Sequence, residues 1–244
     1  MTMRFIRQTG AALLALALTG LWAPEAAAQN DAEASATPQA SAPIDLAGYW
    51  VSVVNEDWRW RMLTPPPGDF ESVPLNDEGE RVGNQWTREM DGQCEAYGVG
   101  GLMRIPTRLN ITWQDEQTLS IETDAGSQER LLRFEPGEPG ARSLQGHSVA
   151  RWDLTGDGDE EDTGYLRVDT SNVTAAWLRR NGVPYSEDAT ITEYIDRFTS
   201  PVGEEWLTVL TIVTDPTYLN TPFVTSTQFK GEQDGSNWMP TSCR

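Results

Sequence analysis

The stretch GYWVSVVNEDWRWRM, residues Gly48 to Met62, decides how the fold of this chain is interpreted. Its first part places Gly48 and Trp50 at the start of an apolar run. Its second part alternates bulky apolar with basic side chains, in the order Trp58, Arg59, Trp60, Arg61, Met62. In a β-strand, neighbouring side chains point to opposite faces, so this alternation predicts one aromatic face and one guanidinium face. The stretch therefore predicts a strand over residues 48–54, and a continuation or second strand over residues 58–63.

The rest of the chain repeats the two-residue period in short segments that end at turn residues. Strands are predicted over residues 109–113, 119–123, 129–134, 144–154, 165–170, 189–198, 206–214 and 223–229. The best helix candidate is residues 76–86, which Asn76 can cap, whereas residues 92–101 and 172–188 are expected to be irregular. About nine or ten strands with one short helix indicate an all-β fold, an antiparallel up-and-down β-barrel, because closure removes unpaired strand edges.

The Gly48-x-Trp50 pattern on the first strand of an antiparallel meander resembles the lipocalins and the wider calycin-type barrels. In lipocalins this tryptophan lies across one end of the barrel, and an arginine from a late strand packs over its ring. The resemblance implies Arg197 as the counterpart of that arginine. Longer segments are similar to a group of exported, lipocalin-like bacterial proteins without an assigned activity: residues 57–70, 103–130, 178–198 and 211–223. The resemblance implies a lipocalin-like barrel and export, and it implies no catalytic residue.

The N-terminus has the composition of a secretory signal peptide. Arg4 and Arg7 precede an apolar run over residues 11–21, and Ala26-Ala27-Ala28 offers a small-residue cleavage site. The apolar run is too short for a comfortable membrane span, and no cysteine lies near the cleavage site for lipid attachment. We therefore predict a signal peptide over residues 1–28, a periplasmic or secreted protein, and no membrane span.

The remaining chain divides into a tether and one folded domain. Residues 29–43 contain no large apolar side chain and are expected to form a disordered tether, because they cannot bury enough surface to offset the entropy of ordering. Residues 44–244 are expected to form a single β-barrel domain. The only cysteines, Cys94 and Cys243, make an even pair in an exported chain, which favours a disulfide.

The charge and the supply of metal ligands exclude several kinds of partner. The net charge is −19, from 18 Lys and Arg residues against 37 Asp and Glu residues, so the chain repels nucleic-acid backbones and anionic membranes. With His147 as its single histidine, the chain cannot assemble a Cys/His metal cluster, and no motif points to a cofactor. The loop over residues 153–162 partly matches a calcium loop but has Gly164 where a bidentate Glu is required. A hydrated acidic loop is the favoured interpretation, and no metal site is predicted.

The tryptophans and arginines of the opening stretch give the leading functional hypothesis, which is binding of a small hydrophobic or aromatic molecule inside the barrel. Inward-facing tryptophans would form an apolar wall, whereas inward-facing arginines would hold a carboxylate or a sulfate. The simpler alternative is core tryptophans and surface arginines. The candidate lining residues are Trp50, Trp58, Trp60, Trp113 and Tyr194, with Arg59, Arg61 or Arg104 to fix a polar end and Tyr185 on a turn over the barrel mouth.

The competing hypothesis is a cofactor-free isomerase, cyclase or dehydratase that uses Asp57, His147, Glu193 and Asp196 as acid–base groups. Glu193 and Asp196 lie on opposite faces of one predicted strand, so one of them is expected to be buried. A buried carboxylate has either a raised pKa, suited to a general base, or an arginine partner in a structural ion pair. No Gly-x-Ser-x-Gly motif supports a serine hydrolase. A third hypothesis is a structural envelope protein with a filled barrel, and the oligomeric state stays open.

Overall fold

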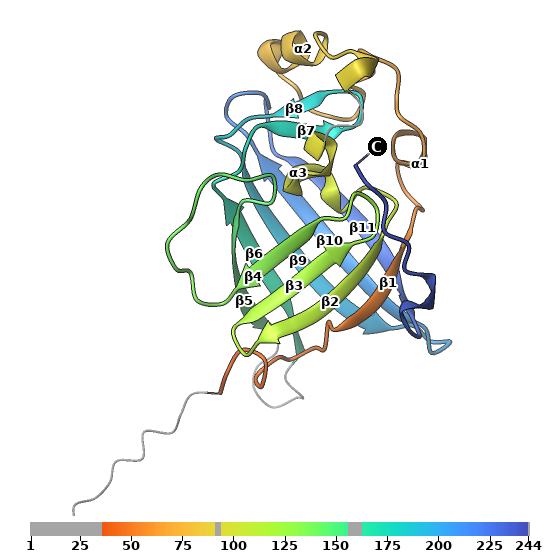
Figure 1. Ribbon diagram of the computed structural model, residues 1–244, viewed down its shortest axis with the longest axis vertical. Coiled ribbons are helices and arrows are strands. Elements are labelled where there is room, and N and C mark those ends of the chain that lie inside the picture. Colours follow the sequence, from red (N-terminus) through yellow and green to blue (C-terminus); the bar gives the residue numbers. More distant parts are fainter. Residues whose placement is uncertain (1–35, 91–93, 156–162, 244) are drawn as a thin grey trace, which may run out of the picture. The chain divides into compact units, whose positions relative to one another are not determined.

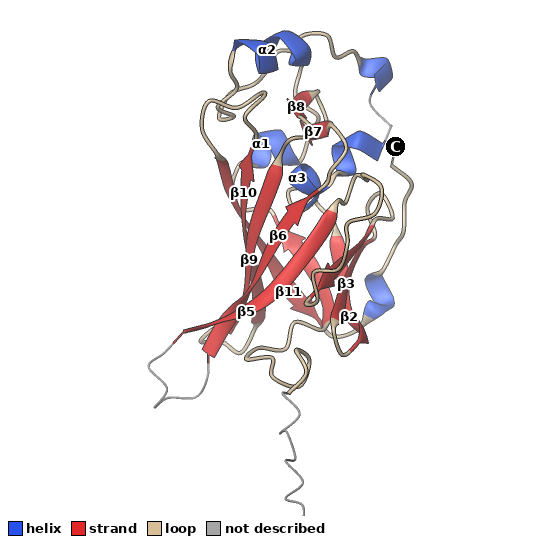
Figure 2. Cartoon of the chain, turned by 90° about the vertical axis from the view of Figure 1, so that its left-hand side faces the viewer, coloured by secondary structure: helices blue, strands red, loops and turns tan. Residues whose placement is uncertain are grey.

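The computed structural model describes residues 36–90, 94–155 and 163–243, and β-strands dominate it (Figures 1 and 2). Nine strands of these residues close into a barrel in the spatial order β1-β11-β10-β9-β6-β5-β4-β3-β2. They are β1 (Gly48–Val53), β2 (Arg108–Asp115), β3 (Thr118–Thr123), β4 (Glu129–Arg133), β5 (His147–Thr155), β6 (Thr163–Ser171), β9 (Thr190–Thr199), β10 (Glu205–Thr214) and β11 (Phe223–Glu232). The predicted all-β barrel is therefore confirmed.

One strand pair departs from the predicted antiparallel arrangement. β4 and β5 run parallel, with Leu132 opposite Ser148. A tight hairpin cannot join parallel neighbours, so residues 134–146 return the chain from one end of the barrel to the other. Residues 135–143 of this connection are exposed and run outside the barrel wall (Figure 1). The barrel is mixed, and the expectation of a purely antiparallel sheet is wrong.

The second half of the opening stretch forms a helical turn, α1 (Trp58–Arg61), where the alternation predicts a strand. Asp57 takes a left-handed conformation with φ of 51°, and the backbone N–H of Arg61 donates to the carbonyl of Asp57. The strand prediction is wrong because so short an alternation does not separate one strand from one helical turn. The turn points its side chains in several directions: Trp58 is 66% exposed, whereas Arg61 is buried.

The other helices are short. α2 (Asp77–Gly83) confirms the predicted helix, and the side chain of Asn76 caps it by accepting a hydrogen bond from the backbone N–H of Gly79 at 2.9 Å. The remaining helices of the described residues are α3 (Val99–Leu102) and the 3-10 helices η1 (Arg88–Met90), η2 (Cys94–Tyr97) and η3 (Gly235–Asn237). Within the segment 92–101, residues 94–101 contain η2 and most of α3 and are therefore more regular than expected, whereas residues 92 and 93 lie outside the described residues.

α3 and a separate two-stranded sheet cover one end of the barrel, which we call the covered end (Figure 1). The sheet pairs β7 (Ala176–Arg179) with β8 (Val183–Tyr185), so the expectation of an irregular segment here is wrong. Three residues, 180–182, connect the two strands, and Gly182 has φ of 80°, the left-handed conformation that commonly ends a three-residue hairpin loop. Tyr185 then packs against the start of α3, where a Cβ on Gly98 would lie 2.2 Å from the Tyr185 hydroxyl.

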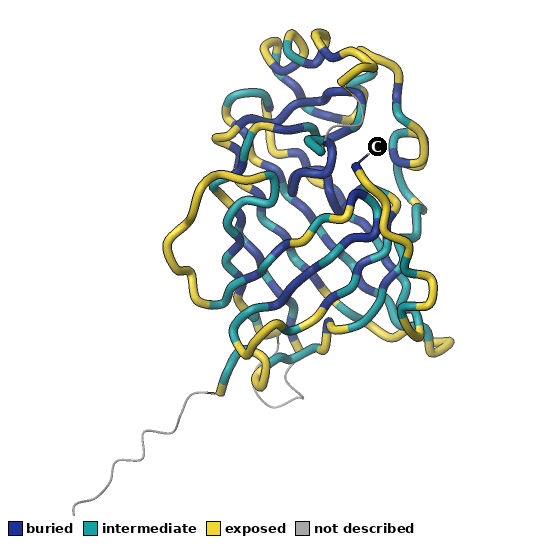
Figure 3. Tube along the Cα trace, viewed as in Figure 1, coloured by how far each residue is buried: buried dark blue, intermediate teal, exposed yellow. Residues whose placement is uncertain are grey.

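Buried residues of the barrel strands and of the covered end form two apolar clusters, and Figure 3 shows buried positions along the strands in dark blue. The cluster away from the covered end includes Trp50, Leu109, Leu132, Leu166, Leu207 and Phe229. The cluster at the covered end includes Val99, Leu178, Tyr185, Ile191, Val213 and Phe223. Along β9, Glu193 lies between Ile191 of one cluster and Ile195 of the other. Glu193 therefore occupies the level at which the two clusters meet.

Aromatic side chains close the end opposite α3. Trp50 is buried, and the guanidinium carbon of Arg197 lies 5.7 Å from the centre of its ring, as the lipocalin resemblance implies. A second group consists of Trp113, Phe134 and Trp152, with 5.6 Å between the centres of neighbouring rings. These rings pack against the adjacent apolar cluster and so complete the core at this end.

The described part of the segment expected to be a tether contacts this same end. Trp152 Nε1 donates to the carbonyl oxygen of Pro38 at 2.8 Å, and the backbone N–H of Gln39 donates to the carbonyl of Glu116 at 3.3 Å. The predicted signal peptide, residues 1–28, and residues 29–35 lie outside the described residues. In the part of the chain that the structure describes, no helix has the length and apolar character needed to cross a membrane.

Cys94 and Cys243 form the predicted disulfide. The bond joins positions 149 residues apart in sequence, with Cα atoms 5.1 Å apart. The segment after β11 thereby reaches the covered end, where Cys243 is bonded to Cys94 at the start of η2 (Figure 1).

Candidate functional site

A pocket with a volume of about 270 Å³ lies at the covered end. Its walls come from parts of the chain that are far apart in sequence: α1 and the residues after it, η2 and α3 with the residues after them, the turn between β3 and β4, and the end of β7. The apolar part of the wall includes Met62, Leu63, Ala96, Tyr97, Ile105 and Leu178. The basic part is Arg61, Arg104, Arg179 and Arg180. The pocket thus combines apolar surface with a concentration of guanidinium groups.

The gathering of arginines stands out in so acidic a chain. Four basic residues line one small pocket, although the chain has 18 Lys and Arg residues in all and a net charge of −19. Arg61, Arg104 and Arg179 are also buried. Burying a charge without a partner is strongly unfavourable. The partners of these three guanidiniums therefore decide what the pocket can do.

Arg61 and Arg104 each have a carboxylate partner. Arg61 pairs through Nη1 with Glu56, and its Nε donates to the carbonyl oxygen of Arg104 at 2.8 Å. Arg104 donates from Nη2 to Asp57 at 2.9 Å. Burial lowers the pKa of Arg61, although the neighbouring Glu56 opposes this change. These two arginines are thus compensated by the chain itself.

Arg179 differs from both of them because no carboxylate of the described residues forms an ion pair with it. Its Nη2 donates to the Ser72 hydroxyl at 2.7 Å, and its guanidinium carbon lies 5.1 Å from the ring centre of Trp60. Its Nε and Nη1 have no hydrogen-bond partner among the described residues. Burial, reinforced by the nearby charge of Arg104, lowers the pKa of Arg179 to about 10. The pocket therefore contains one buried cation that has no carboxylate in ion-pair contact among the described residues, although the more distant charges of Asp57, Asp69 and Glu71 favour its protonated form.

Trp60 is engaged by arginines and by Asp69. The guanidinium carbon of Arg59 lies 5.2 Å from the ring centre, on a ring that Arg179 also contacts. The indole N–H donates to Asp69 at 3.2 Å, and Arg59 pairs with the same carboxylate at 2.9 Å. Trp58 does not line the pocket and faces solvent. The predicted aromatic and guanidinium faces are therefore not formed, and Trp60, Arg61 and Met62 of the alternating group line the pocket, whereas Trp58 and Arg59 do not.

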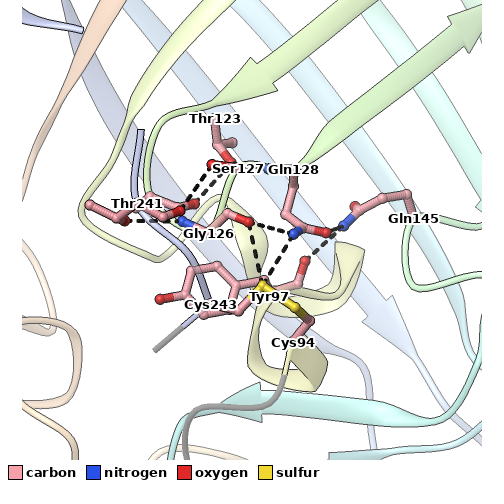
Figure 4. The surroundings of a disulfide bond; sticks show 10 residues. Cys94, Tyr97, Thr123, Gly126, Ser127, Gln128, Gln145, Thr241 and Cys243 are labelled. Carbon is pink, nitrogen blue, oxygen red and sulfur yellow. Dashed lines mark hydrogen bonds between the residues drawn. A yellow bond between two sulfur atoms is a disulfide. The ribbon is translucent and has the colours of Figure 1, made fainter. Parts of the chain in front are cut away.

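The disulfide supports the pocket wall that contains Tyr97 (Figure 4). Tyr97 lies in η2 after Cys94 and packs under Gly126, where a Cβ would lie 2.2 Å from the Tyr97 ring. The C-terminal segment bonds to the same turn, since the backbone N–H of Thr241 donates to the carbonyl of Asp124 at 2.8 Å. One covalent bond and these contacts therefore hold η2 against the β3–β4 turn.

The four candidate acid–base residues lie in four different settings. Glu193 is fully buried inside the barrel and accepts two hydrogen bonds from Arg130, at 3.1 and 2.6 Å. Asp57 is paired with Arg104 near the pocket, and Asp196 is exposed on β9. The Nε2 atom of His147 lies 2.5 Å from the carbonyl oxygen of Pro136. No hydrogen bond or ion pair between described residues joins any two of the four.

Three candidate ligand-binding aromatics lie away from the pocket. Trp113 belongs to the aromatic group at the opposite end. Tyr194 packs against Tyr165 at 5.6 Å and lies on the face of β9 opposite Glu193, outside the barrel. Tyr185 is fully buried beneath α3, and this burial raises the pKa of its hydroxyl. Arg104, by contrast, lines the pocket.

Sequence reasoning missed Arg179, Arg180 and Tyr97 as pocket residues. A usable signal exists for the two arginines, because they directly precede an Asn-Gly pair: Arg179 ends β7, and residues 180–182 form the β7–β8 turn. Recognition of that hairpin would have placed a basic pair at the end of a strand. No comparable local pattern marks Tyr97, whose position depends on the disulfide and on the β3–β4 turn.

The described residues contain no group of three or more His, Cys, Asp and Glu side chains arranged to hold a metal ion. Residues 156–162 of the partial calcium match lie outside the described part of the chain. Comparison with protein-family models, curated proteins and solved structures finds no significant match to this chain. The geometry of the pocket therefore carries the functional argument.

Proposed function

We propose that this protein is an exported, lipocalin-like barrel that binds a small organic molecule in the pocket at its covered end. The observation that carries the proposal is the meeting of three buried arginines with an apolar wall in one pocket of about 270 Å³. Pockets for small ligands have volumes of roughly 300–1,000 Å³ and combine mostly apolar walls with a few polar groups that orient the ligand. The volume favours a small ligand.

The proposed ligand has a hydrophobic or aromatic body and a polar end. Met62, Leu63 and Ile105 offer apolar surface for the body, while the guanidiniums of Arg61, Arg104 and Arg179, which line the same pocket, are the candidates to fix the polar end. The site differs in place from the hypothesis based on sequence, which put the ligand inside the barrel. Inside the barrel, leucine, phenylalanine and other apolar side chains pack together in two buried clusters. The pocket at the covered end is therefore the better candidate for the ligand site.

The disulfide and the composition of the N-terminus support export to the periplasm or the exterior. Disulfides persist in oxidising compartments, and Cys94 and Cys243 are bonded to one another. The enzyme hypothesis has less support, because Glu193 is paired with Arg130 and Asp57 with Arg104. The filled interior agrees with a structural barrel, but a purely structural role gives no reason for an arginine-lined pocket.

The experiment is a screen of small hydrophobic and aromatic molecules against the oxidised mature protein. Binding is followed by intrinsic tryptophan fluorescence, to which Trp60 in the pocket contributes, and by thermal melting. A ligand at about 100 times its Kd stabilises the folded state by about 2.7 kcal/mol, which is measurable as a higher Tm.

Two matched variants locate the site. Leu63→Ala removes an apolar side chain that is 72% exposed and lines the pocket, so it should weaken binding with little effect on folding. The control Val202→Ala removes an apolar side chain that is 81% exposed and does not line the pocket. It should change neither ligand affinity nor folding. The proposal fails if no compound changes the fluorescence or the Tm of the wild-type protein.

A further inference from the structure

Arg179 is the feature of the pocket that the proposed function leaves unexplained. Three arginines around it have carboxylate partners: Arg59 with Asp69, Arg61 with Glu56, and Arg104 with Asp57. Arg179 has a serine hydroxyl and an indole ring instead. Its residue is only 4% exposed, so water does not solvate its charge as it would on the surface. One positive charge is thus buried at the pocket without an ion pair to any carboxylate of the described residues, and Asp57, Asp69 and Glu71 compensate it only from a distance.

We infer that the ligand of this pocket is a small organic anion with a single carboxylate, and that Arg179 binds the carboxylate. The inference rests on the proposed function, since it names the chemical class of ligand for the same site. A carboxylate matches the planar guanidinium in shape and in charge, and hydrogen bonds between such groups are stronger than those between neutral groups. One buried guanidinium without an ion-pair partner among the described residues has room for one carboxylate in direct contact.

The position of Arg179 is fixed before any ligand binds. Its Nη2 donates to Ser72, a residue held in the left-handed region with φ of 67°. Its guanidinium stacks on Trp60, and the next-but-one residue, Asn181, donates to the carbonyl oxygens of Pro66 and Asp69 at 3.1 and 3.0 Å. These contacts join the end of β7 to the segment after α1. A guanidinium held in place in this way loses little further freedom when it binds an anion.

The electrostatic setting also favours an anionic ligand. Burial and the like charge of Arg104 lower the pKa of Arg179 to about 10, which means that the protonated form is disfavoured where it stands. A carboxylate beside it would favour that form again. The Nε and Nη1 atoms are buried and lack partners, so a carboxylate that reaches them through the pocket that Arg179 lines would satisfy donors that the described residues leave unpaired.

The test uses pairs of compounds with the same shape and different charge. Benzoate and benzamide form an aromatic pair, and hexanoate and hexanamide form an aliphatic pair. Isothermal titration calorimetry of the oxidised mature protein should give about tenfold or tighter binding for the acid of whichever pair binds, because hydrogen bonds to charged groups exceed neutral ones. Phenyl phosphate and benzenesulfonate test the geometry and the charge of the anion.

Two substitutions place the effect at Arg179. Arg179→Met should lower benzoate affinity about tenfold or more and leave benzamide within about twofold, while Arg179→Lys should retain part of the benzoate affinity. Arg133→Met, at a partly buried arginine on β4 outside the pocket, should change neither. Circular dichroism of each variant reports whether the barrel is intact.

A third substitution supplies the missing charge from the chain. Ser72 is exposed and adopts a positive φ that Asp and Asn tolerate, so Ser72→Asp should pair with Arg179 and lower benzoate affinity about tenfold. Ser72→Asn has nearly the same shape without the charge and should keep benzoate binding within about threefold. This pair keeps the inference testable if Arg179→Met does not fold.

The outcomes separate the inference from the proposed function. Equal binding of acids and amides, or benzoate affinity that is the same in Arg179→Met, overturns the inference and leaves small-molecule binding intact. Tighter binding of phenyl phosphate than of benzoate overturns the assignment of a single carboxylate. Binding of neither acids, amides nor any compound of the wider screen overturns the proposed function and the inference together.

Discussion

Arg130 and Arg179 are both buried almost completely, yet their surroundings differ. Arg130 is 1% exposed and donates two hydrogen bonds to Glu193 inside the barrel. Arg179 is 4% exposed and contacts a serine hydroxyl and an indole ring. The comparison teaches that burial alone does not separate a structural arginine from a binding one. The presence or absence of a carboxylate partner separates them.

The location of each arginine fits this difference. Glu193 lies where the two apolar clusters of the interior meet, with Thr211 of β10 opposite it in the register. An ion pair at this level satisfies two charges that water does not reach. Arg179 lies at the end of β7 and lines the pocket. The interior arginine is therefore paired within the chain, whereas the pocket arginine has no carboxylate ion pair among the described residues.

Breaking the interior pair should have the largest effect on stability. Glu193→Gln leaves the charge of Arg130 buried without compensation, which should lower the free energy of unfolding by about 3–5 kcal/mol. Urea denaturation followed by tryptophan fluorescence measures the change. The double variant Arg130→Met with Glu193→Leu removes both charges and should recover most of the loss. A loss below about 1 kcal/mol in Glu193→Gln would contradict the structural role of the pair.

Removing the disulfide should affect the pocket end of the molecule more than the barrel interior. The double variant Cys94→Ser with Cys243→Ser should lose about 2–4 kcal/mol of stability, because the unfolded chain regains the freedom of a long loop. It should also weaken ligand binding, since η2 with Tyr97 is no longer held against the β3–β4 turn. Thermal melting and calorimetry test the two effects, and unchanged affinity would show that the disulfide does not support the pocket.

Removing the charge of Arg179 should not lower the free energy of unfolding, whereas breaking the interior ion pair should. The lowering of the Arg179 pKa to about 10 means that its charged form costs on the order of 3 kcal/mol in the folded state. Lost contacts with Trp60 and Ser72 offset part of the gain from removing it. Arg179→Met should therefore be as stable as the wild type or more stable by up to about 2 kcal/mol. A loss of more than about 2 kcal/mol in urea denaturation would make Arg179 a structural residue like Arg130.

The smallest expected effect is the pH dependence of the difference in stability between Arg179→Met and the wild type. The folded-state pKa of Arg179 lies below its ordinary value, so its charge disfavours folding below pH 10, and this penalty fades as the pH rises above about 10. The charges that act on it are Arg104, Asp57, Asp69 and Glu71. The stability advantage of Arg179→Met over the wild type should be constant from about pH 7 to 9 and smaller at about pH 11. An advantage that grows with pH would contradict the assigned direction.

Long alternating segments explain why the barrel could be predicted from sequence. β9, β10 and β11 each alternate over many residues, so the two-residue period is clear. The Gly48-x-Trp50 pattern and Arg197 likewise predicted how one end is closed. The parallel pairing of β4 with β5 could not be predicted, because it depends on the path of the chain over residues 134–146.

The pocket could be predicted only in part. Arg61 and Arg104 were candidates to fix a polar end, and both line it. Arg59 was a candidate as well, but α1 turns it towards Asp69 instead. Arg179 could not be singled out, because its distinguishing property is the lack of a carboxylate ion pair among the residues that the structure describes. That property depends on segments separated by many residues in sequence and becomes visible only in the folded chain.

The most direct test of whether Arg179, unlike Arg130, binds an anion compares the two arginines in one experiment. The Nε–H groups of Arg130 and Arg179 are observed by ¹H–¹⁵N NMR of the labelled mature protein during titration with sodium benzoate, with Arg179→Lys to assign one of the two signals. If benzoate binds Arg179, the Arg179 signal shifts until the protein is saturated, and the Arg130 signal stays constant. An unchanged Arg179 signal under saturating benzoate, or equal shifts of both signals, would contradict binding at Arg179.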